Sequence, residues 1–140
     1  MGREEMLQNV PIFSELGRRD LGRLAKLMVP RAVKGGEVII KEGDQAAGFF
    51  VVSSGKLEAV RGDGANEQHL ANYGAGDFFG EMALLDHQPH SASIRAVTPV
   101  KLFVILQSAF EMLCAENAVF RNELKIISER RKFQNLHPAK

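Results

Sequence analysis

The sequence lacks tryptophan, has one cysteine and has no long hydrophobic run. The single cysteine, Cys114, excludes an intrachain disulfide and fits a reducing, cytoplasmic location. It follows apolar residues in a helical stretch, so we expect a buried, unreactive thiol. No apolar stretch is long enough to cross a bilayer, and the first residues lack the hydrophobic segment of a secretory signal. We therefore expect no membrane segment.

An excess of one charge is also missing. The 18 lysines and arginines nearly balance 17 acidic residues, for a net charge of +1. A protein that binds the phosphate backbone of a nucleic acid needs a clustered basic face. After residue 106 there is also too little chain for a helix-turn-helix domain. These absences predict no DNA binding by this chain.

Motifs for catalysis and metal binding are missing as well. The sequence has no nucleophile elbow, no Walker loop, no Cys-His pairing and no histidine cluster of the kind that cupins use. His87 and His90 lie near Asp86 at a spacing that a metal site could use, but no third strong ligand is indicated. We expect no enzyme, no metal site and no cofactor.

Glycine is absent after residue 80, and ten of the 13 glycines lie between residues 35 and 80. They separate short β-rich runs with turn signals between them. Helix-length crossovers between the runs are lacking, which excludes a doubly wound α/β fold. The pattern predicts a mainly β sandwich or barrel with flanking helices, whose strands include residues 37–41, 49–52, 56–61, 93–97 and 100–106.

Helical periodicity occupies the two ends of the chain. Residues 1–30 predict two helical segments, the second ending near Pro30, and residues 107–134 predict C-terminal helices. The whole chain, 1–140, is thus expected to be one domain whose central part, 31–106, is β-rich.

The C-terminal helices carry an apolar stripe at helical spacing, Phe120, Leu124 and Ile127. The charged run at residues 129–132 follows this stripe. Such a run is most simply a solvated helix end. The amphipathic stripe itself could dock on another protein or on a second copy of the chain.

The segment 76–93 contains the residues best suited to hold a ligand. A glycine, Gly80, precedes a short helix-forming run whose first amides lack intrahelical partners. A helix N-terminus of this kind attracts anions, and small residues let a ligand approach the backbone closely. The carboxylate of Glu81 could accept hydrogen bonds from ligand hydroxyls, or it could simply cap the helix through its charge.

Four motifs along the chain resemble the cyclic-nucleotide-binding domain family, the β-roll modules of bacterial catabolite activators, cyclic-nucleotide-dependent kinases and cyclic-nucleotide-gated channels. They are Phe-Gly-Glu-Met-Ala-Leu-Leu at 79–85 with Pro-x-Ser-Ala-Ser at 89–93, Gly-Gly-Glu-Val-Ile at 35–39, Glu-Gly-Asp at 42–44, and Phe-Phe-Val-Val with a later glycine at 49–55. The resemblance implies a double-stranded β-helix, or jelly-roll-like β-roll, with N-terminal and C-terminal helices.

The resemblance also implies a binding site for cyclic AMP or cyclic GMP, with the choice of purine left open. Residues 79–93 look like the family's phosphate-binding cassette. Glu81 would take the ribose 2′-hydroxyl, and the helix around residues 124–133 would lie near the base as a lid. The implied ligand-binding residues are Phe79, Gly80, Glu81, Met82, Ala83, His90, Ser91 and Ala92.

Two positions depart from the family pattern. Family members have a cassette arginine that binds the phosphate in a bidentate manner, and this chain has His90 at that position. They also have an aspartate that orients the arginine, and this chain has Ala47 there. Histidine cannot copy the bidentate fork, and strand alternation places Arg95 on the opposite face. We therefore expect weak binding of cyclic AMP or cyclic GMP, or binding of a related anion. The alternative is a degenerate β-roll that acts as a ligand-free protein–protein interaction module.

Overall fold

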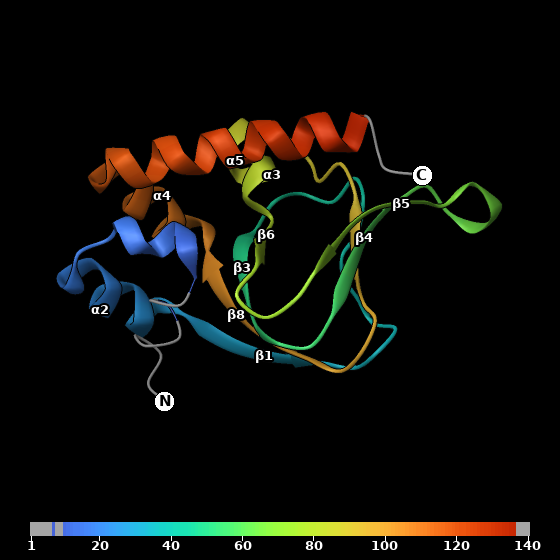
Figure 1. Ribbon diagram of the computed structural model, residues 1–140, viewed down its shortest axis with the longest axis horizontal. Coiled ribbons are helices and arrows are strands. Elements are labelled where there is room, and N and C mark those ends of the chain that lie inside the picture. Colours follow the sequence, from blue (N-terminus) through green and yellow to red (C-terminus); the bar gives the residue numbers. More distant parts are fainter. Residues whose placement is uncertain (1–6, 8–9, 137–140) are drawn as a thin grey trace.

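The computed structural model describes residue 7 and residues 10–136. Helices gather at one end of the molecule, and two four-stranded antiparallel sheets form a roll at the other (Figure 1). The last helix crosses the top of both parts. The expected class, mainly β with flanking helices, is confirmed. The described part of the chain contains no helix that is long and apolar enough to span a membrane.

The first sheet joins the roll to the helices. Its strand order is β1 (Val29–Val33), β8 (Val100–Leu106), β3 (Gly48–Ser54) and β6 (Phe78–Phe79). Side chains alternate along β3, so Phe49 packs toward the helices while its neighbour Phe50 packs inside the roll. Because this sheet is covered on both faces, β3 reads as a continuous apolar run.

The second sheet is covered on one face only. Its order is β2 (Val38–Ile40), β7 (Ser93–Ala96), β4 (Leu57–Arg61) and β5 (Gln68–Tyr73). Leu57 and Ile94 face the interior of the roll, and a short 3₁₀ turn at residues 64–66 joins β4 to β5.

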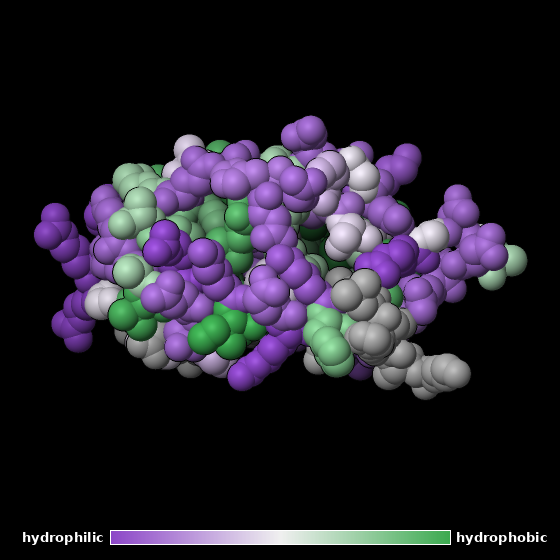
Figure 2. Space-filling view, turned by 90° about the horizontal axis from the view of Figure 1, so that it is seen from above, coloured by the Kyte–Doolittle hydropathy of each residue, from purple (hydrophilic) through white to green (hydrophobic). Residues whose placement is uncertain are grey.

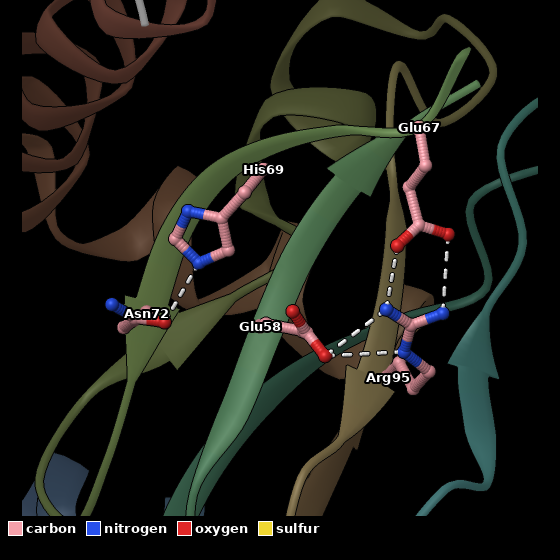
Figure 3. A network of polar contacts seen from close by, with 5 residues as sticks. All are labelled: Glu58, Glu67, His69, Asn72 and Arg95. Atoms are coloured by element: carbon pink, nitrogen blue, oxygen red, sulfur yellow. Dashed lines mark hydrogen bonds and ion pairs between the residues drawn. The ribbon is translucent and has the colours of Figure 1, made fainter. Parts of the chain in front are cut away.

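The outer face of the second sheet carries a polar network (Figure 3). The Arg95 guanidinium donates to Glu58 Oε2 at 3.1 Å and to Glu67 Oε1 at 2.7 Å. Arg95 therefore points away from the interior, as strand alternation predicted. It is already neutralised by two carboxylates and is not a substitute for an arginine inside the roll.

Aromatic side chains bind the helices to the first sheet. The helical end consists of a 3₁₀ helix η1 (Pro11–Glu15), α2 (Arg18–Leu27), α4 (Gln107–Glu116) and α5 (Ala118–Leu136). Their core is a set of ring contacts between 5.2 and 6.1 Å, centred on Phe49 and including Phe13, Phe78, Phe110 and Phe120. The beginning of α5 packs against this core, while the later turns of α5 extend over the roll (Figure 1).

The first strand, β1, was missed by the sequence analysis, as was the two-residue strand β6. The second N-terminal helix was expected to end near Pro30, but α2 ends at Leu27 and β1 begins at Val29. A proline is tolerated here because β1 is an edge strand, where a missing N–H costs no ladder hydrogen bond. The helical pattern expected at the very start of the chain falls mostly outside the described residues.

Candidate functional site

A sharp turn at Gly80 sets the direction of the short helix α3 (Glu81–Asp86). Gly80 joins β6 to α3 with φ +92°, a left-handed conformation that side chains disfavour. A Cβ at this position would lie 3.0 Å from the backbone oxygen of Gly48 and 3.2 Å from the ring of Phe50. Glycine at residue 80 therefore lets the chain turn in close contact with β3.

A cavity of about 160 Å³ opens beside α3. Its wall is formed by α3, the following loop, the interior of the second sheet and Lys132 of α5. The ligand-binding residues that the resemblance implies all line this cavity, namely Phe79, Gly80, Glu81, Met82, Ala83, His90, Ser91 and Ala92.

The carboxylate of Glu81 is buried and paired within the protein. Glu81 has no exposed surface, and its Oε1 accepts a hydrogen bond from Arg131 of α5. Its Oε2 has no hydrogen-bond partner among the described residues. Burial raises the pKa of Glu81, while Arg131 and the backbone N–H groups of Glu81 and Met82 oppose that rise.

The end of α5 is attached to α3 by two ion pairs. Besides the Arg131–Glu81 pair, Lys132 Nζ lies 2.6 Å from Asp86 Oδ2. The guanidinium of Arg131 also lies over two aromatic rings, 4.3 Å from the centroid of Phe78 and 5.3 Å from that of Tyr73.

The interpretation of residues 129–132 as a solvated helix end was wrong for Arg131. The Arg131 side chain is only 17% exposed, and Lys132 lines the cavity. A signal was present in the sequence. Arg131 follows Leu124 by seven residues and so continues the apolar stripe at helical spacing. A charged residue on the buried face of a helix indicates a buried partner.

His90 lines the cavity, but its side chain does not carry a full positive charge. Burial lowers its pKa, against a weaker opposing effect of Asp44. Of the described residues that line the cavity, Lys132 alone carries a full positive charge, and Asp86 and Glu129 already neutralise it. The other departing position, Ala47, is exposed at the end of the turn before β3. The site therefore has an acceptor for hydroxyls but no unengaged cation among the residues described.

The face of the molecule that carries α5 is mainly hydrophilic, with smaller hydrophobic patches between the hydrophilic side chains (Figure 2). His87 and Asp86 lie on the exposed rim of α3. In the described ranges, no three histidine, cysteine or acidic side chains are grouped closely enough to hold a metal ion.

Comparison with known sequences identifies a family over most of the chain. The model of the cyclic nucleotide-binding domain matches residues 30–117. A cAMP-dependent protein kinase regulatory subunit from Colletotrichum orbiculare is 38% identical over 110 residues. That match covers 79% of this chain and 28% of the fungal protein. The chain therefore spans less than a third of the length of this relative.

Solved structures share the fold. The regulatory domain of Toxoplasma gondii PKA, crystallised with cAMP, superposes with a TM-score of 0.82 at 26% identity, covering 91% of this chain and 49% of that one. The regulatory subunit of a cAMP-independent protein kinase A from Trypanosoma brucei has a TM-score of 0.81 at 27% identity, covering 91% and 47%.

A triple variant of the Trypanosoma subunit, with one substitution to arginine, is bound to cAMP in its A site. Its TM-score is 0.77 at 26% identity, covering 86% of this chain and 46% of the variant. The relatives named here are regulatory subunits rather than catalytic chains. From the matched family model and the shared β-roll, this chain belongs to the cyclic nucleotide-binding domain family.

Proposed function

We propose that the chain is a ligand-sensing domain that binds cyclic AMP or cyclic GMP weakly, or a related anion, in the cavity beside α3. The observation that carries this proposal is the cavity itself, lined by Gly80, Glu81, Ser91 and Ala92 and bordered by Lys132 of α5. A degenerate module without a ligand would have no need to keep this space open, because filling it would stabilise the roll.

The chemistry of the cavity wall suits a ribose phosphate in part. Glu81 supplies a carboxylate for a ribose hydroxyl, and Gly80, Met82 and Ala83 line the same cavity, where their backbone N–H groups would hold a phosphate. The small side chains of Ser91 and Ala92 leave room on the far side. The Toxoplasma domain crystallised with cAMP, which shares this fold, supports the same class of ligand.

The missing cation explains why the binding is weak. Removing one partner of a desolvated charge pair costs about 2–5 kcal/mol, which lowers affinity by roughly 30-fold to several thousand-fold. His90 is mostly neutral because burial lowers its pKa. The Trypanosoma subunit supports this view, since it belongs to a cAMP-independent kinase and a variant that gains an arginine is bound to cAMP.

A movement of α5 would signal to a partner protein that the ligand is bound. Lys132 lies on the cavity wall, and two ion pairs connect the end of α5 to α3. A ligand that contacts the cavity better with α5 in one position than in another shifts the population of those positions. The partner that reads this movement would contact α5 or the segment that follows it.

Titration calorimetry at pH 7.5 with cyclic AMP and cyclic GMP tests this function. We expect saturable binding with a dissociation constant above micromolar. Ser91→Asp, which places a negative charge against the phosphate, should abolish binding. The matched variant Ser54→Asp adds the same charge at an exposed position outside the cavity and should bind like the wild type.

Sub-micromolar affinity would contradict the weak site. Absence of binding, together with a tight homodimer or protein complex, would favour the interaction module instead. A thermal-shift screen extended to cyclic dinucleotides would identify another anion, since a ligand that binds only the native state raises the midpoint.

A further inference from the structure

One corner of the roll brings together three segments beside the cavity. The Gly43 N–H donates to the His90 carbonyl oxygen at 2.8 Å, and the Glu42 N–H donates to Ser93 Oγ at 2.9 Å. Glu42 Oε1 in turn accepts a hydrogen bond from the Gly62 N–H at 2.9 Å. The turn after β2, the end of β4 and the start of β7 are therefore held together at the position where the cassette arginine is missing.

Arg61, the last residue of β4, belongs to this corner. β4 pairs with β7 without a shift from Leu57 to Val60, and Leu57 and Ala59 face the interior of the roll. Because side chains alternate along a strand, Arg61 lies on the same face as these two residues. It therefore faces the side of the sheet opposite to that of Arg95 (Figure 3).

The guanidinium of Arg61 is bonded to the wall of the cavity. Its Nε donates to the backbone oxygen of Ser91 at 3.3 Å, and the residue is half-buried. Ser91 lines the cavity and follows His90 directly in the chain. Arg61 is not itself a wall residue, but this bond places a guanidinium one residue away from the position where the family has its phosphate-binding arginine.

A phosphate in the cavity is a stronger acceptor than the Ser91 carbonyl. The carbonyl oxygen is uncharged, whereas a phosphate is negative and can accept two parallel hydrogen bonds from one guanidinium. Rotation about the side-chain bonds of Arg61 changes the acceptor while its backbone stays paired with β5. The exchange of acceptors therefore favours the phosphate.

We propose that Arg61 supplies the positive charge for the phosphate of the ligand, in place of the arginine that this cassette lacks at residue 90. The inference rests on the proposed function of the cavity. Arg61 approaches from β4 rather than from the cassette, and it must first leave Ser91, so it offsets only part of the missing attraction. Binding therefore stays weak, but what remains of it depends on Arg61.

The test measures the affinities for cyclic AMP and cyclic GMP of the wild type, Arg61→Gln and Arg61→Lys, by NMR titration because the binding is weak. Arg18→Gln is the matched control, since it removes the same charge from an exposed position of α2 outside the cavity wall. Arg61→Gln and Arg18→Gln are also compared in a His90→Arg, Ala47→Asp background, where the cassette has its own arginine.

We expect Arg61→Gln to bind both cyclic nucleotides roughly tenfold more weakly than Arg18→Gln, because a hydrogen bond to a charged group is lost. Arg61→Lys, which keeps the charge, should fall between the two. In the background with the cassette arginine, the loss should be less than about threefold, because the phosphate then has its bidentate partner.

Three results would overturn the role of Arg61. Equal losses in the two backgrounds would indicate damage to the roll, and a loss confined to cyclic GMP would place Arg61 on the guanine instead. Unchanged affinity in Arg61→Gln would remove Arg61 from the site while leaving the proposed function intact. If the wild type and Arg18→Gln bind neither nucleotide, the proposed function fails, and the role of Arg61 fails with it.

The Nε–H resonance of Arg61 gives an independent readout, and its absence from the spectrum of Arg61→Lys identifies it. This resonance should shift as cyclic AMP saturates the wild type, because the Nε–H exchanges a carbonyl for a phosphate. A resonance that stays in place at saturation would show that Arg61 keeps its bond to Ser91.

Discussion

His90 and Asp44 are joined by a backbone hydrogen bond in which the His90 N–H donates to the Asp44 carbonyl oxygen at 2.9 Å. A second bond runs in the other direction along the same pair of segments, from the Gly43 N–H to the His90 carbonyl oxygen at 2.8 Å. Residue 90 is thus fixed beside the turn that ends at Ala47. The two positions that depart from the family pattern lie on segments held together by the backbone.

This arrangement predicts that the two departures are coupled. His90→Arg supplies a cation for a phosphate, and Ala47→Asp supplies a carboxylate that orients it. We expect the double variant to bind cyclic AMP at least tenfold more tightly than His90→Arg alone, measured by calorimetry at pH 7.5. Ala47→Asp alone is the control and should give no gain. Equal affinities for the single and double variants would contradict the bracing role of residue 47.

A second prediction concerns pH. Burial lowers the pKa of His90, so its ring is neutral in the free protein near pH 7.5. A bound phosphate favours the imidazolium and raises that pKa, so binding takes up a proton. Affinity for cyclic AMP should therefore increase as the pH falls from 8 to 6. Calorimetry in two buffers of different ionisation enthalpy should detect the proton uptake.

His90→Asn is the control for this proton and should bind with no such pH dependence. The folded-state pKa of His90 lies below its unfolded value of about 6.5. The unfolded chain therefore binds the proton more readily, and His90 contributes stability above that value that is lost as the pH falls below it. Affinity in the wild type that stays constant from pH 8 to 6 would rule out His90 as a phosphate contact.

A third prediction separates two effects of adding a side chain at residue 80, namely the strain of the left-handed backbone and the contact of the new Cβ with β3. Gly80→Ala should destabilise the protein by about 2–3 kcal/mol, since it combines a left-handed backbone with a Cβ 3.0 Å from the Gly48 oxygen. Gly36 has a similar φ of +88° but open space around it. Gly36→Ala should therefore cost only about 1–2 kcal/mol. Urea unfolding measures both, and equal losses would show that the contact with β3 is relaxed.

A fourth prediction concerns Cys114. The thiol is buried, and burial raises its pKa to about 11. At pH 8 the thiolate needed for alkylation is scarce and enclosed. Reaction with iodoacetamide, followed by mass spectrometry, should be slow in the native protein and fast in denaturant. Rapid native labelling would mean that α4 opens readily from the core.

Much of the fold could be predicted from the sequence because the relevant information is local. The glycines between residues 35 and 80 mark turns, and the apolar stripe of Phe120, Leu124 and Ile127 marks the buried face of α5. Pro30 misled the prediction, because a proline after a helical pattern indicates an ending while an edge strand also accepts it. Which of these applies depends on the neighbouring strand β8, where Phe103, 73 residues further along the chain, pairs with Pro30.

The cassette and its missing arginine were likewise readable from the sequence, because position and residue type suffice to locate a motif. The charge pairing of the site was decided only by the tertiary structure. Arg131 and Glu81 lie 50 residues apart, and their contact depends on how far α5 extends across the roll. A local charge pattern shows which groups are available, but burial and distance select which of them meet and which face water.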